Sequence, residues 1–174
     1  MFQAVKHMIS GAVEVAPPKD VKAFNLAANV DAEAGGIYYF DGGELKRCVS
    51  QGSGTSNRHG EIPAVVIIED EDGRAGGITA RGYYITPGMV FKAKPAKADS
   101  TAVGDPRERD NNFKEGVMNA RFSDNGKYVD WETDPAGFCP MTVLGVVEGD
   151  NDDDSYVYVT FHKTLFCGSW TTPT

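Results

Sequence analysis

The sequence predicts an all-β protein, a small barrel or sandwich of about nine or ten short antiparallel strands. Runs of β-branched and aromatic residues recur roughly every 8 to 12 residues, with turn residues between them. This spacing is typical of such folds. The chain contains 20 glycines and 9 prolines, a turn density that favours short strands over long helices. Its 174 residues are enough for one domain with a substantial core.

The clearest strands lie between residues 64 and 94. An apolar run at 64–68 is followed, after an acidic turn, by a second run that ends at Ile85. Pro87 presets φ for a turn and Gly88 tolerates positive φ, so this pair predicts a type II turn. In residues 89–94 the side chains Met89, Phe91 and Ala93 alternate with Val90, Lys92 and Lys94, as in a strand with one face more exposed to solvent. We therefore expect a three-stranded meander in the middle of an antiparallel sheet.

The remaining strands are predicted from the same signals, in chain order. Asp41-Gly42-Gly43 and Asn125-Gly126 predict tight hairpin turns, because these residues accept positive φ. Residues 51–60 contain no apolar side chain and are expected to form a surface loop. The other expected strands are residues 21–26, 37–40, 44–50, 117–122, 127–131, 141–147 and 156–161.

Both ends of the sequence carry apolar residues outside these strands. We interpret residues 1–18 as an extended N-terminal arm and 19–174 as a single β domain with an aromatic tail at 162–174, because Pro17-Pro18 would uncouple the arm. Exposed apolar side chains are costly unless a partner buries them. The candidate contact residues for a partner or a second subunit are Phe2, Val5, Met8, Ile9, Val13, Leu165, Phe166 and Trp170. A frayed end is the alternative for the arm, and in either case deletion of residues 1–16 should leave the fold intact.

Charge and composition exclude several classes of partner. With 17 basic and 25 acidic residues the formal charge is −8, which argues against binding to nucleic acid or to an anionic membrane. The sequence has no signal-peptide pattern, and none of its apolar runs approaches the ~20 residues of a membrane span. Its three cysteines, Cys48, Cys139 and Cys167, lack metal-binding spacing, so buried thiols in a reducing compartment are favoured over a disulfide.

Catalytic and metal-binding patterns are weak. The acidic clusters at 69–73 and 150–155 would need a carboxylate at the twelfth position of a calcium loop, where Arg81 and Phe161 stand instead. His59 lies near serines in the 51–60 loop, which holds neither the base nor an orienting carboxylate of a hydrolase. Cys48 lies beside two basic residues, yet a packed thiol is the simpler interpretation. We expect no catalytic residue, no metal and no cofactor.

Several segments, in order, resemble the small capsid decoration proteins, also called cement or head-stabilising proteins, of tailed bacteriophages. The resemblance covers roughly residues 35 to 161, and its motifs are strands and turns. The segments are GIYYFDGG (36–43), PAVVIIEDED (63–72), YITPGMVF (84–91), Val103-Gly104, VLGV (143–146) and YVYVTF (156–161). The chain departs from the pattern in the 51–60 loop and in the tail after Phe161, so the resemblance does not indicate which surface faces the shell.

The resemblance implies a β-barrel-like or β-tulip fold, a homotrimer and no enzymatic activity. It implies a structural virion protein that is made in the host cytoplasm, binds the major capsid protein on the outer surface of an icosahedral phage head and stabilises it. Two other classes remain open. One is another virion component, such as a tail-tube or fibre-associated β domain. The other is a carbohydrate-binding or hydrolytic β domain, for which Trp131 and Trp170 could supply an aromatic platform.

Overall fold

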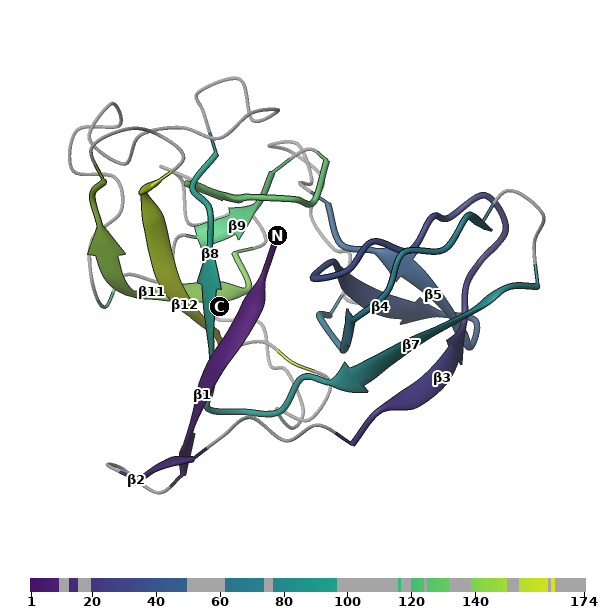
Figure 1. Ribbon diagram of the computed structural model, residues 1–174, viewed down its shortest axis with the longest axis horizontal. Helices are drawn as coiled ribbons and strands as arrows, with labels where there is room; N and C mark the ends of the chain where they lie inside the picture. Colours follow the sequence, from purple (N-terminus) through teal and green to yellow (C-terminus); the bar gives the residue numbers. More distant parts are fainter. Residues whose placement is uncertain are drawn as a thin grey trace, which may run out of the picture.

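The structure is nearly all β and consists of two antiparallel sheets in a sandwich-like arrangement (Figure 1). This confirms the all-β class and the sandwich alternative, since the sheets do not close into a barrel. The computed structural model describes residues 1–9, 13–15, 20–49, 62–73, 77–96, 116, 120–123, 125–131, 139–149, 154–162 and 164.

Seven of the described strands form the first sheet, in the order β10-β9-β11-β12-β8-β1-β2. Along β12 the buried residues Val157, Val159 and Phe161 alternate with half-buried ones, as expected of a strand with one face on a core. The strands are β1 (Gln3–Ile9), β2 (Val13–Val15), β8 (Met89–Ala93), β9 (Ala120–Phe122), β10 (Val129–Trp131), β11 (Met141–Val147) and β12 (Tyr156–Phe161).

The second sheet contains five strands in the order β3-β7-β6-β4-β5. The sheet curls so that its two outer strands approach each other: an isolated parallel bridge joins Leu26, just after β3, to Leu45 in β5. Every residue of β6 is buried, which explains why its sequence is continuously apolar rather than alternating. The strands are β3 (Lys22–Asn25), β4 (Ile37–Asp41), β5 (Glu44–Arg47), β6 (Val65–Ile67) and β7 (Thr79–Tyr84).

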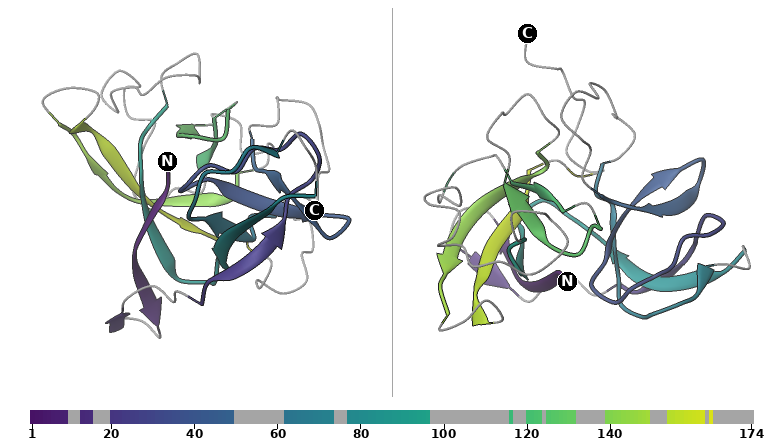
Figure 2. Two further views of the ribbon diagram at one scale, coloured as in Figure 1. Left: turned by 45° about the vertical axis from the view of Figure 1, so that its right-hand side comes forward. Right: turned by 90° about the horizontal axis from the view of Figure 1, so that it is seen from above.

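Two apolar cores stabilise this arrangement. The larger one lies between the sheets and combines residues of the first sheet, such as Phe91 and Met141, with Ile37 and Val66 of the second. The smaller one fills the curl of the second sheet, where Tyr38, Leu45 and Ile67 are fully buried. The larger core therefore joins the two sheets, whose arrangement Figure 2 shows from two further directions.

The predicted three-stranded meander is confirmed for its first pair, β6 with β7, and wrong for its second, β7 with β8. The turn at residues 86–89 is present, with a φ of 88° at Gly88 and a hydrogen bond from Met89 N to Thr86 O of 3.2 Å. However, β7 lies between β3 and β6, whereas β8 lies between β12 and β1. Neither strand has an edge left for the other, so the turn carries the chain from one sheet to the other instead of closing a hairpin.

The two predicted Gly turns differ in outcome. The hairpin at Asp41–Glu44 is confirmed, with positive φ at both intervening glycines. Among the described residues of the connection between β9 and β10, Gly126 alone has positive φ. Asn125 instead accepts hydrogen bonds through Oδ1 from Ser123 Oγ and Lys127 N, so its side chain shapes the turn.

The predictions for the other strands, the cysteines and the 51–60 loop have the following outcomes. Each expected strand overlaps an observed one, and the predicted limits of β11 and β12 are reproduced. Cys48 and Cys139 are buried thiols. The 51–60 loop, Cys167 and most of the tail beyond His162 lie outside the described residues.

Candidate interaction site at the N-terminal hairpin

The N-terminal hairpin, β1 with β2, projects from the edge of the seven-stranded sheet. The first part of β1 pairs with β8, from Gln3 opposite Lys92 to His7 opposite Met89. Its last part pairs with β2, with Ile9 opposite Val13. Because β8 begins at Met89, the end of β1 continues beyond it together with β2, as Figure 1 shows at the lower left.

One side of this hairpin is an open edge. β2 is the last strand in the sheet order, so its outer backbone groups have no neighbouring strand among the described residues. Such an edge presents a row of N–H and C=O groups that can pair with a strand of another chain. The sequence of the projecting part is mostly apolar, with Met8, Ile9, Val13 and Val15.

The root of the hairpin is fixed in the protein's own core. Phe2 is 3% exposed, and its ring lies 5.6 Å from that of Phe122 and 6.0 Å from that of Phe161. Phe2 N also donates a 3.0 Å hydrogen bond to Gly35 O, just before β4. A Cβ at Gly35 would lie 2.8 Å from Phe2 O, so this close approach requires glycine.

These contacts correct the interpretation of residues 1–18 as an extended arm. The segment contains two strands of the sheet, and Phe2 is a core residue rather than a contact residue. Pattern reasoning failed here because β1 obtains its partner, β8, from a part of the chain more than 80 residues away. A short N-terminal run carries no local signal for such a pairing.

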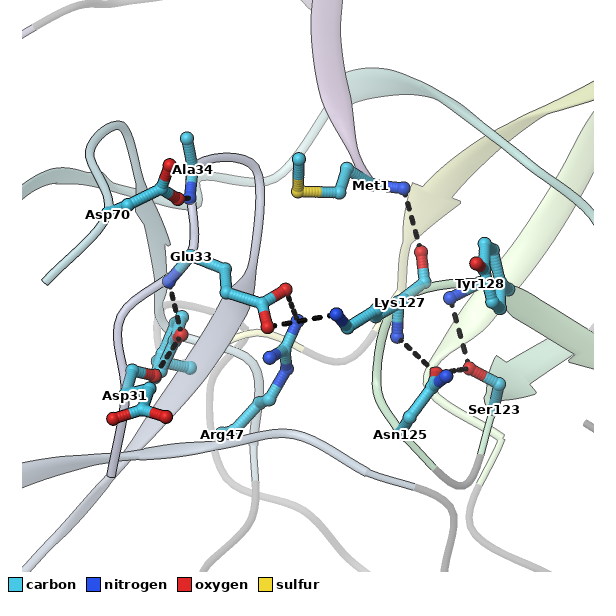
Figure 3. A network of polar contacts seen from close by, with 11 residues as sticks. Met1, Asp31, Glu33, Ala34, Arg47, Asp70, Ser123, Asn125, Lys127 and Tyr128 are labelled. Atoms are coloured by element: carbon cyan, nitrogen blue, oxygen red, sulfur yellow. Dashed lines mark hydrogen bonds and ion pairs between the residues drawn. The ribbon is translucent and has the colours of Figure 1, made fainter. Parts of the chain in front are cut away.

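A polar network adjoins this root, where the two sheets meet (Figure 3). The Met1 amine donates to Lys127 O over 2.8 Å. The Glu33 carboxylate, from the five-stranded side, accepts a 3.0 Å bond from Arg47 and forms a 3.0 Å ion pair with Lys127 of the seven-stranded side. The Arg47 hydrogen bond is the main reason why the pKa of Glu33 is lowered to about 2, with Lys127 adding to the effect. The carboxylate therefore links the two sheets.

The other predicted contact residues are placed as follows. Val5 is 37% exposed and lies at a bulge in β1. Met8 and Ile9 belong to β1 and Val13 to β2, but their side chains are outside the described part of the structure. Leu165, Phe166 and Trp170 are also outside it. The sequence analysis did not single out Leu144, which is exposed on β11. Because its neighbours in the strand are mostly apolar, the sequence indicated that it would be buried.

The chemically notable residues are engaged in local contacts. Glu69, in the first acidic cluster, accepts two 2.6 Å bonds from Arg81, which lower its pKa. Asp70 accepts a 2.8 Å bond from Ala34 N. His162 Nδ1 lies 2.9 Å from Thr142 Oγ1. Within the described ranges, no three His, Cys, Asp or Glu residues form a group that could hold a metal ion.

Comparison with known proteins adds no relative: no family model, no curated protein and no solved structure matches the chain. Among the residues that the structure describes, no helix is both long and apolar enough to span a membrane.

Proposed function

We propose that this protein is a capsid decoration protein, which binds the major capsid protein on the outer surface of an icosahedral phage head and stabilises the shell. It acts by binding, as a homotrimer and without catalysis. The proposal starts from the resemblance of residues 35–161 to such proteins.

The observation that carries the proposal is the N-terminal hairpin. A decoration protein needs a rigid body and an element that reaches a neighbouring molecule. The hairpin combines both properties, because Phe2 fixes its root in the core while β2 offers an open edge and an apolar sequence beyond β8. A preformed hairpin also loses less conformational entropy on binding than a disordered arm would.

In this proposal the affinity comes from three copies of the same hairpin contact in one trimer. Burying three or four apolar side chains stabilises a contact by roughly 1.5–3 kcal/mol each before ordering costs, so one hairpin alone binds weakly. Three linked hairpins on a trimer raise the effective concentration of each contact and make the attachment tight. The charge of −8 keeps the unattached protein soluble.

The test is cosedimentation of the purified chain with phage heads that lack the protein. The double variant Ile9→Asp/Val13→Asp places two carboxylates at paired positions of the projecting part, and should lose head binding by roughly a hundredfold, as for the loss of an interface hot spot. Val21→Asp is the matched control, because Val21 is 41% exposed beside β3 of the other sheet. It should bind like the wild type.

A circular dichroism melt of each variant distinguishes lost binding from lost folding. Wild-type protein that fails to bind the heads would refute the proposed function. If the wild type and the double variant bind equally well, the attachment does not run through the hairpin.

A further inference from the structure

A chemically labile pair of residues lies in the connection between β9 and β10. The sequence contains one Asn-Gly pair, Asn125-Gly126. The side-chain amide of an asparagine can be attacked by the backbone nitrogen of the next residue, and such side chains are thermolabile for this reason. Glycine in the next position hinders the attack least, because it has no side chain. Asn125 is therefore the asparagine of this chain at which spontaneous deamidation is chemically easiest.

The reaction needs water as its only co-reactant. The Gly126 amide nitrogen loses its proton and bonds to Cγ of Asn125. The bond between Cγ and Nδ2 then breaks, and Nδ2 takes up a proton and leaves as ammonia. Water opens the resulting cyclic succinimide at one of its two carbonyl carbons. Opening at Cγ gives aspartate, whereas opening at the backbone carbonyl gives isoaspartate, in which the main chain runs through the former side chain.

In the folded protein both reacting groups are held by hydrogen bonds (Figure 3). Gly126 N donates a 2.9 Å bond to Ser123 O, so the proton that must be lost is bound to a carbonyl group. Asn125 Oδ1 accepts bonds from Ser123 Oγ at 2.8 Å and from Lys127 N at 2.9 Å. Attack requires the nitrogen to turn towards Cγ in a defined orientation. That movement breaks hydrogen bonds that form the turn.

The two donors to Oδ1 also have an opposite effect on the reaction. They polarise the side-chain carbonyl, as the donors of an oxyanion hole do for a developing negative charge. Polarisation accelerates the attack only once the nitrogen has reached the carbon, since a correctly oriented approach comes first. The restraint on Gly126 N therefore dominates, and the folded turn slows the reaction.

The turn is also packed against the other sheet. A Cβ at Gly126 would collide with the carbonyl oxygen of Cys48, which directly follows β5. The next residue, Lys127, forms a 3.0 Å ion pair with Glu33 of the five-stranded side. Opening of the turn consequently breaks contacts between the two sheets, and the strength of these contacts controls how often it opens.

We propose that Asn125 is a deamidation site that the folded protein protects, and that it reacts when the turn between β9 and β10 opens at the junction of the two sheets. This inference is independent of the proposed function. Aspartate at position 125 keeps an oxygen that accepts the bonds from Ser123 and Lys127. Isoaspartate lengthens the main chain beside Gly126, where the Cys48 carbonyl leaves no room, so it prevents the turn from closing again.

The test follows the conversion of Asn125 in folded and in denatured full-length protein. Both samples are incubated in mildly alkaline buffer, the second with guanidinium chloride. Trypsin then releases residues 122–127, in which Asn125 is the only amide side chain. Mass spectrometry measures the replacement of the amide by an acid, and chromatography separates aspartate from isoaspartate. Conversion should be at least about tenfold slower in the folded protein, because its rate is proportional to the small population of the open turn.

Two variants test whether the junction controls the opening. Glu33→Gln removes the ion pair with Lys127, so the folded variant should convert about fivefold faster than the folded wild type. Glu44→Gln is the matched control, because Glu44 is exposed on β5, and it should convert like the wild type. Circular dichroism melts show whether both variants are folded at the incubation temperature. The comparison of folded with denatured wild type needs neither variant.

Each outcome decides the inference. Slow conversion in the folded wild type, with faster conversion in Glu33→Gln but not in Glu44→Gln, supports it. Equal conversion in folded and denatured wild type overturns it, because the turn would then give no protection. Faster conversion in the folded protein overturns it in favour of catalysis by the donors to Oδ1. Lack of conversion in the denatured protein, or folded Glu33→Gln that converts like the wild type, also overturns it.

Discussion

Gly88 shows how one residue directs the path of the chain between the sheets. Its φ of 88° lies in the region that L side chains rarely adopt. The turn that it closes separates β7 of one sheet from β8 of the other. A changed direction at this point would misplace β8, whose Met89 and Phe91 are fully buried.

We expect Gly88→Val to destabilise the protein by about 1–3 kcal/mol, because a β-branched residue is strained at this φ. Gly88→Asn should cost clearly less, since asparagine tolerates the third position of a type II turn. Urea denaturation of the three proteins measures the difference. Equal midpoints for Gly88→Val and the wild type would contradict the turn geometry.

At the scale of elements, β1 has two different halves. Its first half pairs with β8 and is fixed to the core by the ring contacts of Phe2, which directly precedes the strand. Its second half is paired with β2 beyond the end of β8. Loss of the whole segment would therefore damage the fold, contrary to the expectation that residues 1–16 are dispensable for folding.

Phe2→Ala tests this division directly. The substitution should lower the free energy of unfolding by about 3–5 kcal/mol, as for other large-to-small changes in cores. Val5→Ala is its control in the adjoining strand β1 and should change stability by less than about 0.5 kcal/mol, because Val5 is partly exposed. A Phe2→Ala protein with an unchanged melt would restore the interpretation as an arm.

Local patterns predicted the elements better than their partners. The runs at Met141–Val147 and Tyr156–Phe161 are rich in β-branched residues, so their strand conformation could be read directly. Nothing in the sequence near β8 indicates that it pairs with β1 and β12, because such pairing depends on contacts far along the chain. The same limit explains why Phe2 was assigned to the candidate site and Leu144 was missed.

At the scale of the whole molecule, the two sheets are joined by a common apolar core and by the polar junction at Glu33. The core supplies most of the stability, since apolar burial is the dominant favourable contribution to folding. The junction supplies a specific link, because Glu33 pairs with Arg47 on its own side and with Lys127 on the other. Its contribution should depend on pH, whereas that of the apolar core does not.

The sign of this dependence follows from the lowered pKa of Glu33. Its ordinary value of about 4.5 falls to about 2 in the folded protein. The stabilisation is therefore fully present above pH 4.5 and is lost as the pH falls from 4.5 towards 2. Because the carboxylate is partly exposed, we expect its contribution to be about 1 kcal/mol, as for accessible ion pairs.

Glu33→Gln should consequently be less stable than the wild type by about 1 kcal/mol at pH 6, and the difference should vanish near pH 2. Other carboxylates titrate in both proteins and cancel in the comparison. Glu44→Gln is the matched control, because Glu44 is exposed on β5 and its carboxylate forms no ion pair with the described residues. Its difference from the wild type should be small at every pH. Urea melts of the three proteins across this pH range provide the measurement. A Glu33→Gln difference that stays constant from pH 6 to pH 2 would show that the ionised carboxylate does not hold the two sheets together.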